Sequence, residues 1–349
     1  MIRFECDYTE GAHPKILERL VETNLQQTPG YGVDEYCEHA RTLIREACAT
    51  PEAGVHFLVG GTQTNKTIIS SILRPYQGVI ASESGHIAIH EAGAIESTGH
   101  KVICLAGNER GKLNGAQIRA VCDAHYHEDM PEHAVQPGMV YISQPTEYGT
   151  LYSLEELQEV SRTCKEYGLP LMVDGARLGY GLIAEGNDVG LPELASLCDV
   201  FYIGGTKVGA LFGEAVVFTN LALNKNFRYH IKQNGGMLAK GRLLGIQFET
   251  LFTDGLYLEI ARHADQMAMK LQKAFESHGV RMRHPSTTNQ IFPILSNKVL
   301  EKIAGEYTFS HAEVLDETHT VARFCTCWAT KEENVDKLIQ DLPRFLSED

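Results

Sequence analysis

The most informative stretch of the chain is L-M-V-D-G-A-R (171–177), an apolar run that ends in Asp174 and is followed by a glycine. A second run, F-Y-I-G-G-T-K (201–207), leads through two glycines to Lys207. Apolar runs of this length between turn residues are typical of buried strands. Each run therefore places a charged side chain where a buried strand ends, and a buried charge is costly unless a partner compensates it.

Pyridoxal phosphate would compensate both charges. Its aldehyde forms a Schiff base with a lysine, and its pyridine nitrogen needs a carboxylate partner. Lys207 and Asp174 are residues of these two kinds. Two salt-bridge residues, or other active-site residues of an α/β fold, would give the same pattern, so the pair by itself leaves both interpretations open.

Short apolar segments alternate with helical patterns between about residues 50 and 220. The predicted strands are 55–59, 78–81, 101–105, 139–143, 170–173, 200–203 and 215–218. This alternation predicts an α/β fold with a mostly parallel sheet that helices cover on both faces. Further on, a helical stretch over about 243–278 precedes strand-like segments at 280–283, 290–294 and 321–328. We therefore predict a large domain over 1–240, with an N-terminal arm, and a small C-terminal α+β domain over 241–349, joined by a long helix.

Composition excludes several classes of protein. The net charge of −14 disfavours nucleic acids and anionic membranes as partners. No apolar run approaches the roughly 20 residues of a membrane span, and residues 1–5 show no signal-peptide pattern. The nine cysteines form no C-x-x-C pair, and the fifteen histidines follow no metal-ligand spacing. We expect a cytoplasmic protein with reduced thiols and no metal site.

A possible phosphate site lies in F-L-V-G-G-T-Q-T-N (57–65), which reads as a strand, a glycine turn and a helix start. Backbone amides at a helix N-terminus, with threonine hydroxyls, can bind an anion. Neither G-x-G-x-x-G nor a Walker lysine is present, so one isolated phosphate is favoured over a dinucleotide or a nucleoside triphosphate. A glycine-rich helix start without a ligand would look the same.

A histidine opens the helix predicted in G-H-I-A-I-H-E-A-G-A (85–94). An imidazole at that place could stack on an aromatic cofactor, although capping or surface positions are the ordinary roles of such a residue. His90 and Glu91 lie one turn further on, and we expect them on a solvated helix face.

In this order, the segments resemble the threonine aldolase branch of the fold-type I pyridoxal phosphate enzymes, which is grouped with the β-eliminating lyases. The resemblance rests on residues 57–65 and 85–94, V-D-G-A-R-L (173–178) and G-G-T-K-V-G (204–209), and more weakly on G-Y-G-V-D (30–34) and N-G-G-M (234–237). It spans about residues 1–240, and the remainder matches only in outline. The resemblance implies the fold-type I, transferase-like architecture.

The resemblance also implies roles around the cofactor. Lys207 would hold pyridoxal phosphate as a Schiff base, Asp174 would pair with its pyridine nitrogen, and His86 would stack on its ring. The phosphate would lie against Gly61, Thr62 and Gln63, with Thr206 near it.

Other roles concern the substrate. Arg177 would lie at the cofactor hydroxyl and the substrate carboxylate, and Arg323, in an otherwise apolar strand, would be the second carboxylate ligand. Cys6 stands where the family has serine in Arg-Ser-Asp-Thr and is expected to face the substrate. Tyr31 resembles a residue that reaches the neighbouring subunit's site, which implies a homodimer or homotetramer with shared active sites.

The sequence departs from the family pattern at two positions that bear on the reaction. Glu147 stands where the family carries a histidine, and Leu238 replaces an arginine. The catalytic base is therefore open between His86, His90 with a water, and Glu147. The implied reaction is Cα–Cβ cleavage of a β-hydroxy amino acid, L-threonine or L-allo-threonine, to glycine and acetaldehyde. A β-eliminating lyase that acts on another amino acid, or a non-catalytic binding protein with this fold, are the alternatives.

Overall fold

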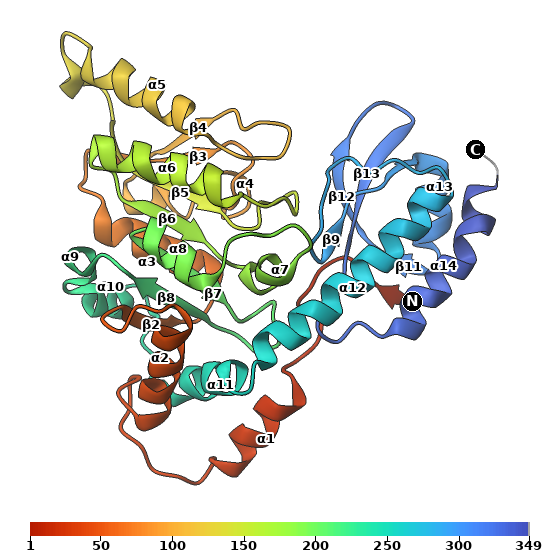
Figure 1. The fold of residues 1–349 in the computed structure, drawn as a ribbon, viewed down its shortest axis with the longest axis horizontal. Coiled ribbons are helices and arrows are strands. Elements are labelled where there is room, and N and C mark those ends of the chain that lie inside the picture. Colours follow the sequence, from red (N-terminus) through yellow and green to blue (C-terminus); the bar gives the residue numbers. More distant parts are fainter. Residues whose placement is uncertain (348–349) are drawn as a thin grey trace.

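The computed structural model describes residues 1–347. A large α/β unit and a smaller unit lie side by side, and α12 (Leu256–Ser277) runs from one to the other (Figure 1). The large unit is built on a seven-stranded sheet with the order β2-β8-β7-β6-β5-β3-β4. Neighbouring strands are parallel except at β8, which is antiparallel to β2 and β7. The predicted α/β fold with a mostly parallel sheet is confirmed.

The seven strands match the predicted segments within a few residues. They are β2 (Gly54–Leu58), β3 (Gln77–Ser82), β4 (Val102–Leu105), β5 (Gln136–Ser143), β6 (Leu171–Asp174), β7 (Val200–Gly204) and β8 (Glu214–Phe218). Strands β5 to β8 are buried almost throughout, as expected for a sheet that is covered on both faces.

Successive side chains of the strands enter two separate hydrophobic cores. One core packs the sheet against α2 (Glu35–Ala47), α5 (Gly115–Tyr126), α6 (Leu154–Tyr167), α7 (Leu178–Ile183), α8 (Leu191–Leu197) and α11 (Arg242–Phe252). The other packs the opposite face against α3 (Gly61–Ile72), α4 (His86–Ile89) and α10 (Phe227–Gln233). Helices α5 and α6 both begin with a capping box, which Asn114 and Ser153 provide.

The small unit has a sheet of its own. Its order is β10 (Ile294–Ser296), β13 (His319–Cys325), β12 (Ser310–Val314), and β9 (Gln290–Ile291) also pairs with β13. Helices α13 (Asn297–Ala304) and α14 (Glu332–Leu346) pack on it. The N-terminal arm begins in this unit, because β1 (Ile2–Arg3) pairs with β11 (Tyr307–Thr308) and Phe4 enters its core.

Several sequence-based expectations for the chain after residue 240 are corrected. The long helix predicted over 243–278 is two helices, because Asp254 and Gly255 take positive φ angles and end α11 before α12 starts. Helix α11 packs against α2, so it lies with the large unit although it follows residue 240. The strand predicted at 280–283 is only an isolated bridge from Met282 to Pro293, and the one predicted at 290–294 is split into β9 and β10 at Pro293, which has no N–H to donate.

The fold gathers the predicted site residues at one edge of the large sheet. Asp174 is the last residue of β6, Lys207 follows β7, and Glu147 follows β5. The N-termini of α3 and α4 follow β2 and β3 at the same edge. Ligand sites of open α/β sheets lie at the carboxyl ends of the strands, so this edge is where a site is expected. Within residues 1–347, no helix combines the length and apolar character that crossing a bilayer requires.

Candidate active site

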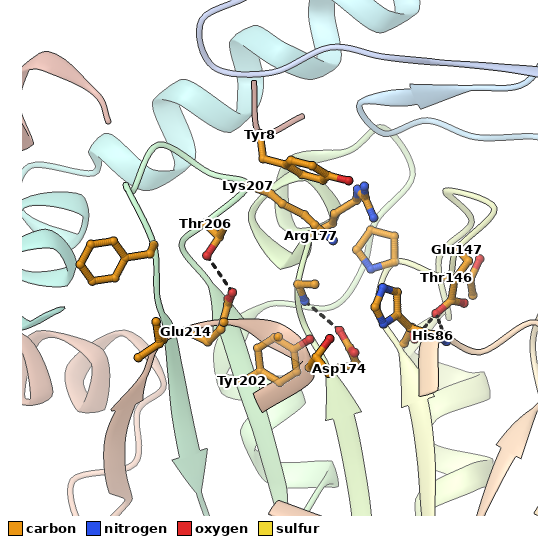
Figure 2. Close-up of a pocket in the computed structure, with 18 residues that line it drawn as sticks. Tyr8, His86, Thr146, Glu147, Asp174, Arg177, Tyr202, Thr206, Lys207 and Glu214 are labelled. Carbon is orange, nitrogen blue, oxygen red and sulfur yellow. Dashed lines mark hydrogen bonds between the residues drawn. The ribbon is translucent and has the colours of Figure 1, made fainter. Parts of the chain in front are cut away.

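A cavity of about 320 Å³ opens at this edge (Figure 2). Its walls include most of the residues that the sequence singled out. They are Tyr8, Val59, Gly60, Gly61, Thr62, His86, Ser143, Pro145, Thr146, Glu147, Asp174, Ala176, Arg177, Tyr202, Thr206, Lys207, Phe212 and Glu214.

Asp174 forms the base of the cavity and is almost completely buried. Its Oδ2 accepts hydrogen bonds from Tyr141 Oη at 2.5 Å and Asn65 Nδ2 at 3.0 Å, and its Oδ1 accepts one from the Ala176 N–H at 3.0 Å. Burial alone would raise the pKa of Asp174, but nearby His86 and the hydroxyl donors lower it below its usual value. Within residues 1–347, no lysine or arginine forms an ion pair with Asp174, so His86 and the hydrogen-bond donors are what favour its charged form.

Lys207 extends into the cavity from the turn between β7 and β8 (Figure 2). Burial, followed by the charge of Arg177, lowers the pKa of Lys207. Within residues 1–347, no hydrogen bond or ion pair within 4 Å engages its ammonium group. A lysine with a depressed pKa and a free amine can act as a nucleophile toward a carbonyl group.

Glu214 is a second carboxyl group in the same wall, and no motif in the sequence indicated it. Its Oε1 accepts a hydrogen bond from Thr206 Oγ1 at 2.9 Å, and its Oε2 accepts one from the Gly205 N–H at 3.2 Å. Burial raises the pKa of Glu214 to about 8. Its only sequence signal is an acidic residue at the start of an apolar strand, which does not by itself indicate a site.

The helix N-terminus predicted to bind an anion lies in the cavity wall. Gly60 is the N-cap of α3, and a Cβ built on it would meet no atom within 4 Å, so the space in front of the helix is open. Gly61 and Thr62 also line the cavity. Gln63 does not: its side chain accepts from the Val59 N–H and donates to the Asn234 carbonyl, which ties α3 to the end of α10.

His86 lies at the start of α4 and lines the cavity. Its Nδ1 is 2.7 Å from Glu91 Oε1, and its backbone N–H donates to Glu147 Oε1 at 2.9 Å. The expectation that Glu91 is solvated is wrong, because its side chain is fully buried behind His86. The sequence pattern indicated a helix that continues through Glu91. The helix in fact ends at Ile89, and Glu91 lies in the turn after it with its side chain directed into the protein.

Glu147 lines the cavity and accepts a second hydrogen bond, from Ser143 Oγ at 2.7 Å. Burial raises the pKa of Glu147 above its usual value; the Ser143 hydroxyl opposes that shift and the charge of Asp174 adds to it. A carboxylate with a raised pKa is a stronger base than an ordinary glutamate.

Arg177 forms the upper wall and is anchored by Asp7, another residue that the sequence analysis did not single out. Arg177 Nε donates to Asp7 Oδ2 at 2.7 Å, and Nη2 donates to Asp7 Oδ1 at 2.9 Å. Asn289 Nδ2 also donates to Asp7 Oδ2, at 2.9 Å. Asp7 follows Cys6 and stands where the family has the aspartate of Arg-Ser-Asp-Thr, which is the sequence signal that could have indicated it.

Four other predicted residues lie outside the cavity wall. Arg323, on β13, donates from Nη2 to the Glu5 carbonyl and to Ser310 Oγ, both at 3.3 Å, while its buried Nε has no partner in the described chain. Cys6 lines a neighbouring recess of about 240 Å³. His90 lies at the end of α4 with its ring 5.6 Å from that of His86. Tyr31 is 47% exposed and packs beneath Lys232, away from the cavity.

Comparison with known proteins finds relatives over the whole chain. Residues 6–298 match the β-eliminating lyase family. A low specificity L-threonine aldolase of a Pseudomonas species is 33% identical, over 99% of this chain and 98% of that protein. The low specificity L-threonine aldolase of Saccharomyces cerevisiae is 26% identical, over 78% of this chain and 70% of that protein.

Solved structures agree with these relatives. A threonine aldolase of Leishmania major matches with a TM-score of 0.96 and 44% identity, over 99% of this chain and 100% of that one. A single-mutant aspartate aminotransferase of Thermus thermophilus matches with a TM-score of 0.73 at 15% identity, over 99% of this chain and 91% of that one, and so shows the shared fold alone. The resemblance seen in the sequence is confirmed: the chain belongs to the β-eliminating lyase family.

Proposed function

We propose that this protein is a pyridoxal-phosphate-dependent aldehyde-lyase that cleaves the Cα–Cβ bond of L-threonine or L-allo-threonine to give glycine and acetaldehyde. The single observation that carries the proposal is the one cavity that brings together Lys207, Asp174, His86 and the N-terminus of α3. The curated relatives of nearly full length are L-threonine aldolases, which supports the same reaction class.

The cavity fits the cofactor group by group. An amine with a depressed pKa suits the aldehyde, a buried carboxylate suits a protonated pyridine nitrogen, and an open helix N-terminus suits a phosphate. We propose that Lys207 holds the cofactor, Asp174 pairs with its ring nitrogen, and His86 stacks on the ring. Gly61 and Thr62 would bind the phosphate, with Thr206 close to it and Gln63 contributing only its backbone amide.

The remaining charged groups suit an amino acid. Arg177 lines the cavity and keeps N–H groups beyond those that bind Asp7, so it can bind a carboxylate there. Arg323 lies outside the cavity wall, and we propose it as the second carboxylate ligand because its Nε has no hydrogen-bond partner among residues 1–347. Two guanidinium groups on one carboxylate fix the orientation of the bonds at Cα. Cys6, which lines the neighbouring recess, precedes Asp7 in the N-terminal arm, and its contact with the substrate stays a prediction.

We propose Glu147 as the base. It lines the cavity, whereas His90 does not, and burial raises its pKa, which makes it a stronger base than an ordinary glutamate. The bound cofactor would act as a sink for the electron pair released when the Cα–Cβ bond breaks. Glu147 would accept the β-hydroxyl proton so that the aldehyde leaves, and a proton delivered to Cα would complete glycine.

We also propose a cytoplasmic homo-oligomer, either a dimer or a tetramer, in which subunits share active sites. Tyr31 is exposed and far from its own cavity, as expected of a residue that serves a neighbouring subunit. All nine cysteines are free thiols, which fits a reducing compartment.

One assay tests the reaction. Purified protein with added pyridoxal phosphate is incubated with L-threonine, L-allo-threonine, L-serine and O-acetyl-L-serine, and glycine, acetaldehyde, pyruvate and ammonia are quantified. Lys207→Ala is the negative control. Glycine and acetaldehyde in equal amounts support the aldolase. Pyruvate and ammonia instead would make the protein a β-eliminating lyase, and no product despite bound cofactor would favour a non-catalytic binding protein.

A further inference from the structure

Glu91 is a buried carboxylate for which the reaction described above has no use. Its side chain is fully buried, and its Oε1 lies 2.7 Å from both His86 Nδ1 and Asn65 Nδ2. Its Oε2 has no hydrogen-bond partner among residues 1–347, and no lysine or arginine of that range lies within 4 Å of the carboxylate. An amide or apolar side chain would fill this space without the cost of burying a charge, so the charge points to a function.

Asn65 connects this carboxylate to the cavity. Its Nδ2 carries two N–H groups, one directed at Glu91 Oε1 and the other at Asp174 Oδ2, 3.0 Å away. Asn65 is completely buried on α3, the helix whose N-terminus lines the cavity at Gly60 and Gly61. One rigid helix therefore carries both the anion-binding terminus and the amide that joins the two carboxylates.

His86 is held at two points by these contacts. With the ring proton on Nδ1, the imidazole donates to Glu91, which directs Nε2 away from that carboxylate. The backbone N–H of His86 is fixed separately by Glu147. A carboxylate that binds one nitrogen of an imidazole fixes the tautomer and the orientation of the ring.

We propose that Glu91 and Asn65 are positioning residues for the cofactor ring. Glu91 sets the orientation of the His86 imidazole, and Asn65 links that imidazole through Glu91 to Asp174, so that the two groups that face the ring keep a constant spacing. This inference rests on the proposed function, because that function identifies the ring as the one of pyridoxal phosphate. It adds to the site two residues that do not themselves line the cavity.

The first test compares Glu91→Gln, which keeps the shape and removes the charge, with Glu96→Gln, an exposed glutamate in the turn that follows. Apoprotein of each is titrated with pyridoxal phosphate by its visible band, and kcat and KM are measured with L-threonine. We expect Glu91→Gln to raise the cofactor Kd and to lower kcat roughly 10- to 100-fold, as does the loss of residues that orient metal-ligating histidines in other proteins. The KM for L-threonine should change less than about twofold, since the amino acid is bound elsewhere. Wild-type values in Glu91→Gln would overturn the proposal.

The second test separates positioning from a role in folding. Glu91→Gln is introduced into a His86→Phe background, which keeps a ring and removes the nitrogen that Glu91 binds. If Glu91 acts through His86, the added change weakens cofactor binding by less than about twofold, because the interaction is already absent. If Glu91→Gln weakens cofactor binding in the His86→Phe background as much as it does in the wild type, Glu91 acts on the fold and not through His86, which contradicts the proposal. Asn65→Ala provides an independent variant and should weaken cofactor binding while His86 is intact.

The cofactor titration also separates this inference from the proposed reaction. If the wild-type protein binds pyridoxal phosphate but cleaves no β-hydroxy amino acid, the reaction is wrong and the titration of the variants still decides the roles of Glu91 and Asn65. If the wild-type protein binds no cofactor, both proposals fail together.

Discussion

Arg177 and Asp7 form a bidentate ion pair that holds the N-terminal arm against the wall of the cavity, with N···O distances of 2.7 and 2.9 Å. The Asp7 side chain is fully buried and that of Arg177 is 13% exposed. Burial would raise the pKa of Asp7, but Arg177 and then Lys207 outweigh it and lower the pKa. The pair thus orients a guanidinium that would otherwise be free to rotate.

Replacing Asp7 should therefore destabilise the fold. Asp7→Ala leaves a nearly buried guanidinium unpaired, which typically costs about 3–5 kcal/mol, and urea unfolding at pH 7 should show a loss of that order. Glu18→Ala, on the exposed face of α1 (Pro14–Glu22), is the control. Because the folded-state pKa of Asp7 is lowered, this stabilisation is present above pH ~4 and disappears as the pH falls through the folded-state value. Equal unfolding free energies for Asp7→Ala and wild type would contradict the assignment.

Lys207 should carry the cofactor covalently. Borohydride reduction of the protein with pyridoxal phosphate should bleach the visible band and leave a pyridoxyl group on the peptide that contains Lys207, as read by mass spectrometry. Lys207→Ala should show no label, whereas Lys225→Ala should be labelled like the wild type. A label on any other lysine would refute the assignment.

Asp174→Asn should separate cofactor binding from turnover. The amide keeps the shape but cannot hold the pyridine nitrogen protonated, and the loss of one group that stabilises charge in the transition state commonly costs ~2.7–4 kcal/mol, or about 10²–10³ in kcat. Some cofactor should remain, bound through Gly61 and Thr62. Turnover close to the wild-type rate in a variant that is loaded with cofactor would rule out this role.

Glu147→Gln tests the base. We expect kcat to fall by roughly 10²–10⁴, the usual contribution of general base catalysis. Because the pKa of Glu147 is raised, the acid limb of the wild-type pH–rate profile should lie above the ordinary glutamate value of ~4.3, and activity should rise as this carboxyl loses its proton. The limb should be absent from Glu147→Gln and unchanged in Glu128→Gln, an exposed control. Persistence of the limb in Glu147→Gln would assign the base elsewhere.

Asp265 offers a test of stability that is independent of the active site. It is buried in α12 with no hydrogen-bond partner for either carboxylate oxygen within residues 1–347, and burial raises its pKa to about 9. Between about pH 4 and 9 the folded chain keeps a proton that the unfolded chain releases, so stability falls as the pH rises, by ~1.4 kcal/mol per unit for one group. The free energy of unfolding is measured in urea at pH 5, 6, 7 and 8. Asp265→Asn should remove from its pH dependence a slope of this size. If the free energy of unfolding changes with pH equally in Asp265→Asn and in the wild type, Asp265 is not the group that titrates.

Sequence periodicity predicted the large sheet well for a physical reason. A strand that is covered on both faces is a nearly continuous apolar run, and the glycines that end it are local signals. Asp174 and Lys207 could be placed at strand ends from such runs alone. Their convergence in the structure has a simple cause, because the carboxyl ends of parallel strands lie at one edge of the sheet.

Contacts between distant segments could not be predicted in this way. Asp7 meets Arg177 across 170 positions, and Asn65 meets Asp174 across 109. Glu91 looked like a residue of a solvated helix face, since an acidic side chain near a helix end is usually exposed.

The sequence by itself therefore determined the fold class, the strand ends that carry Asp174 and Lys207, and the helix start at Gly60, because each is encoded in a few consecutive residues. Only the tertiary structure decided which carboxylates are buried and what they bind, because burial depends on how separate elements pack against one another. The connection of Glu91 through Asn65 to Asp174 exists only once α3, the turn that follows α4, and β6 have come together.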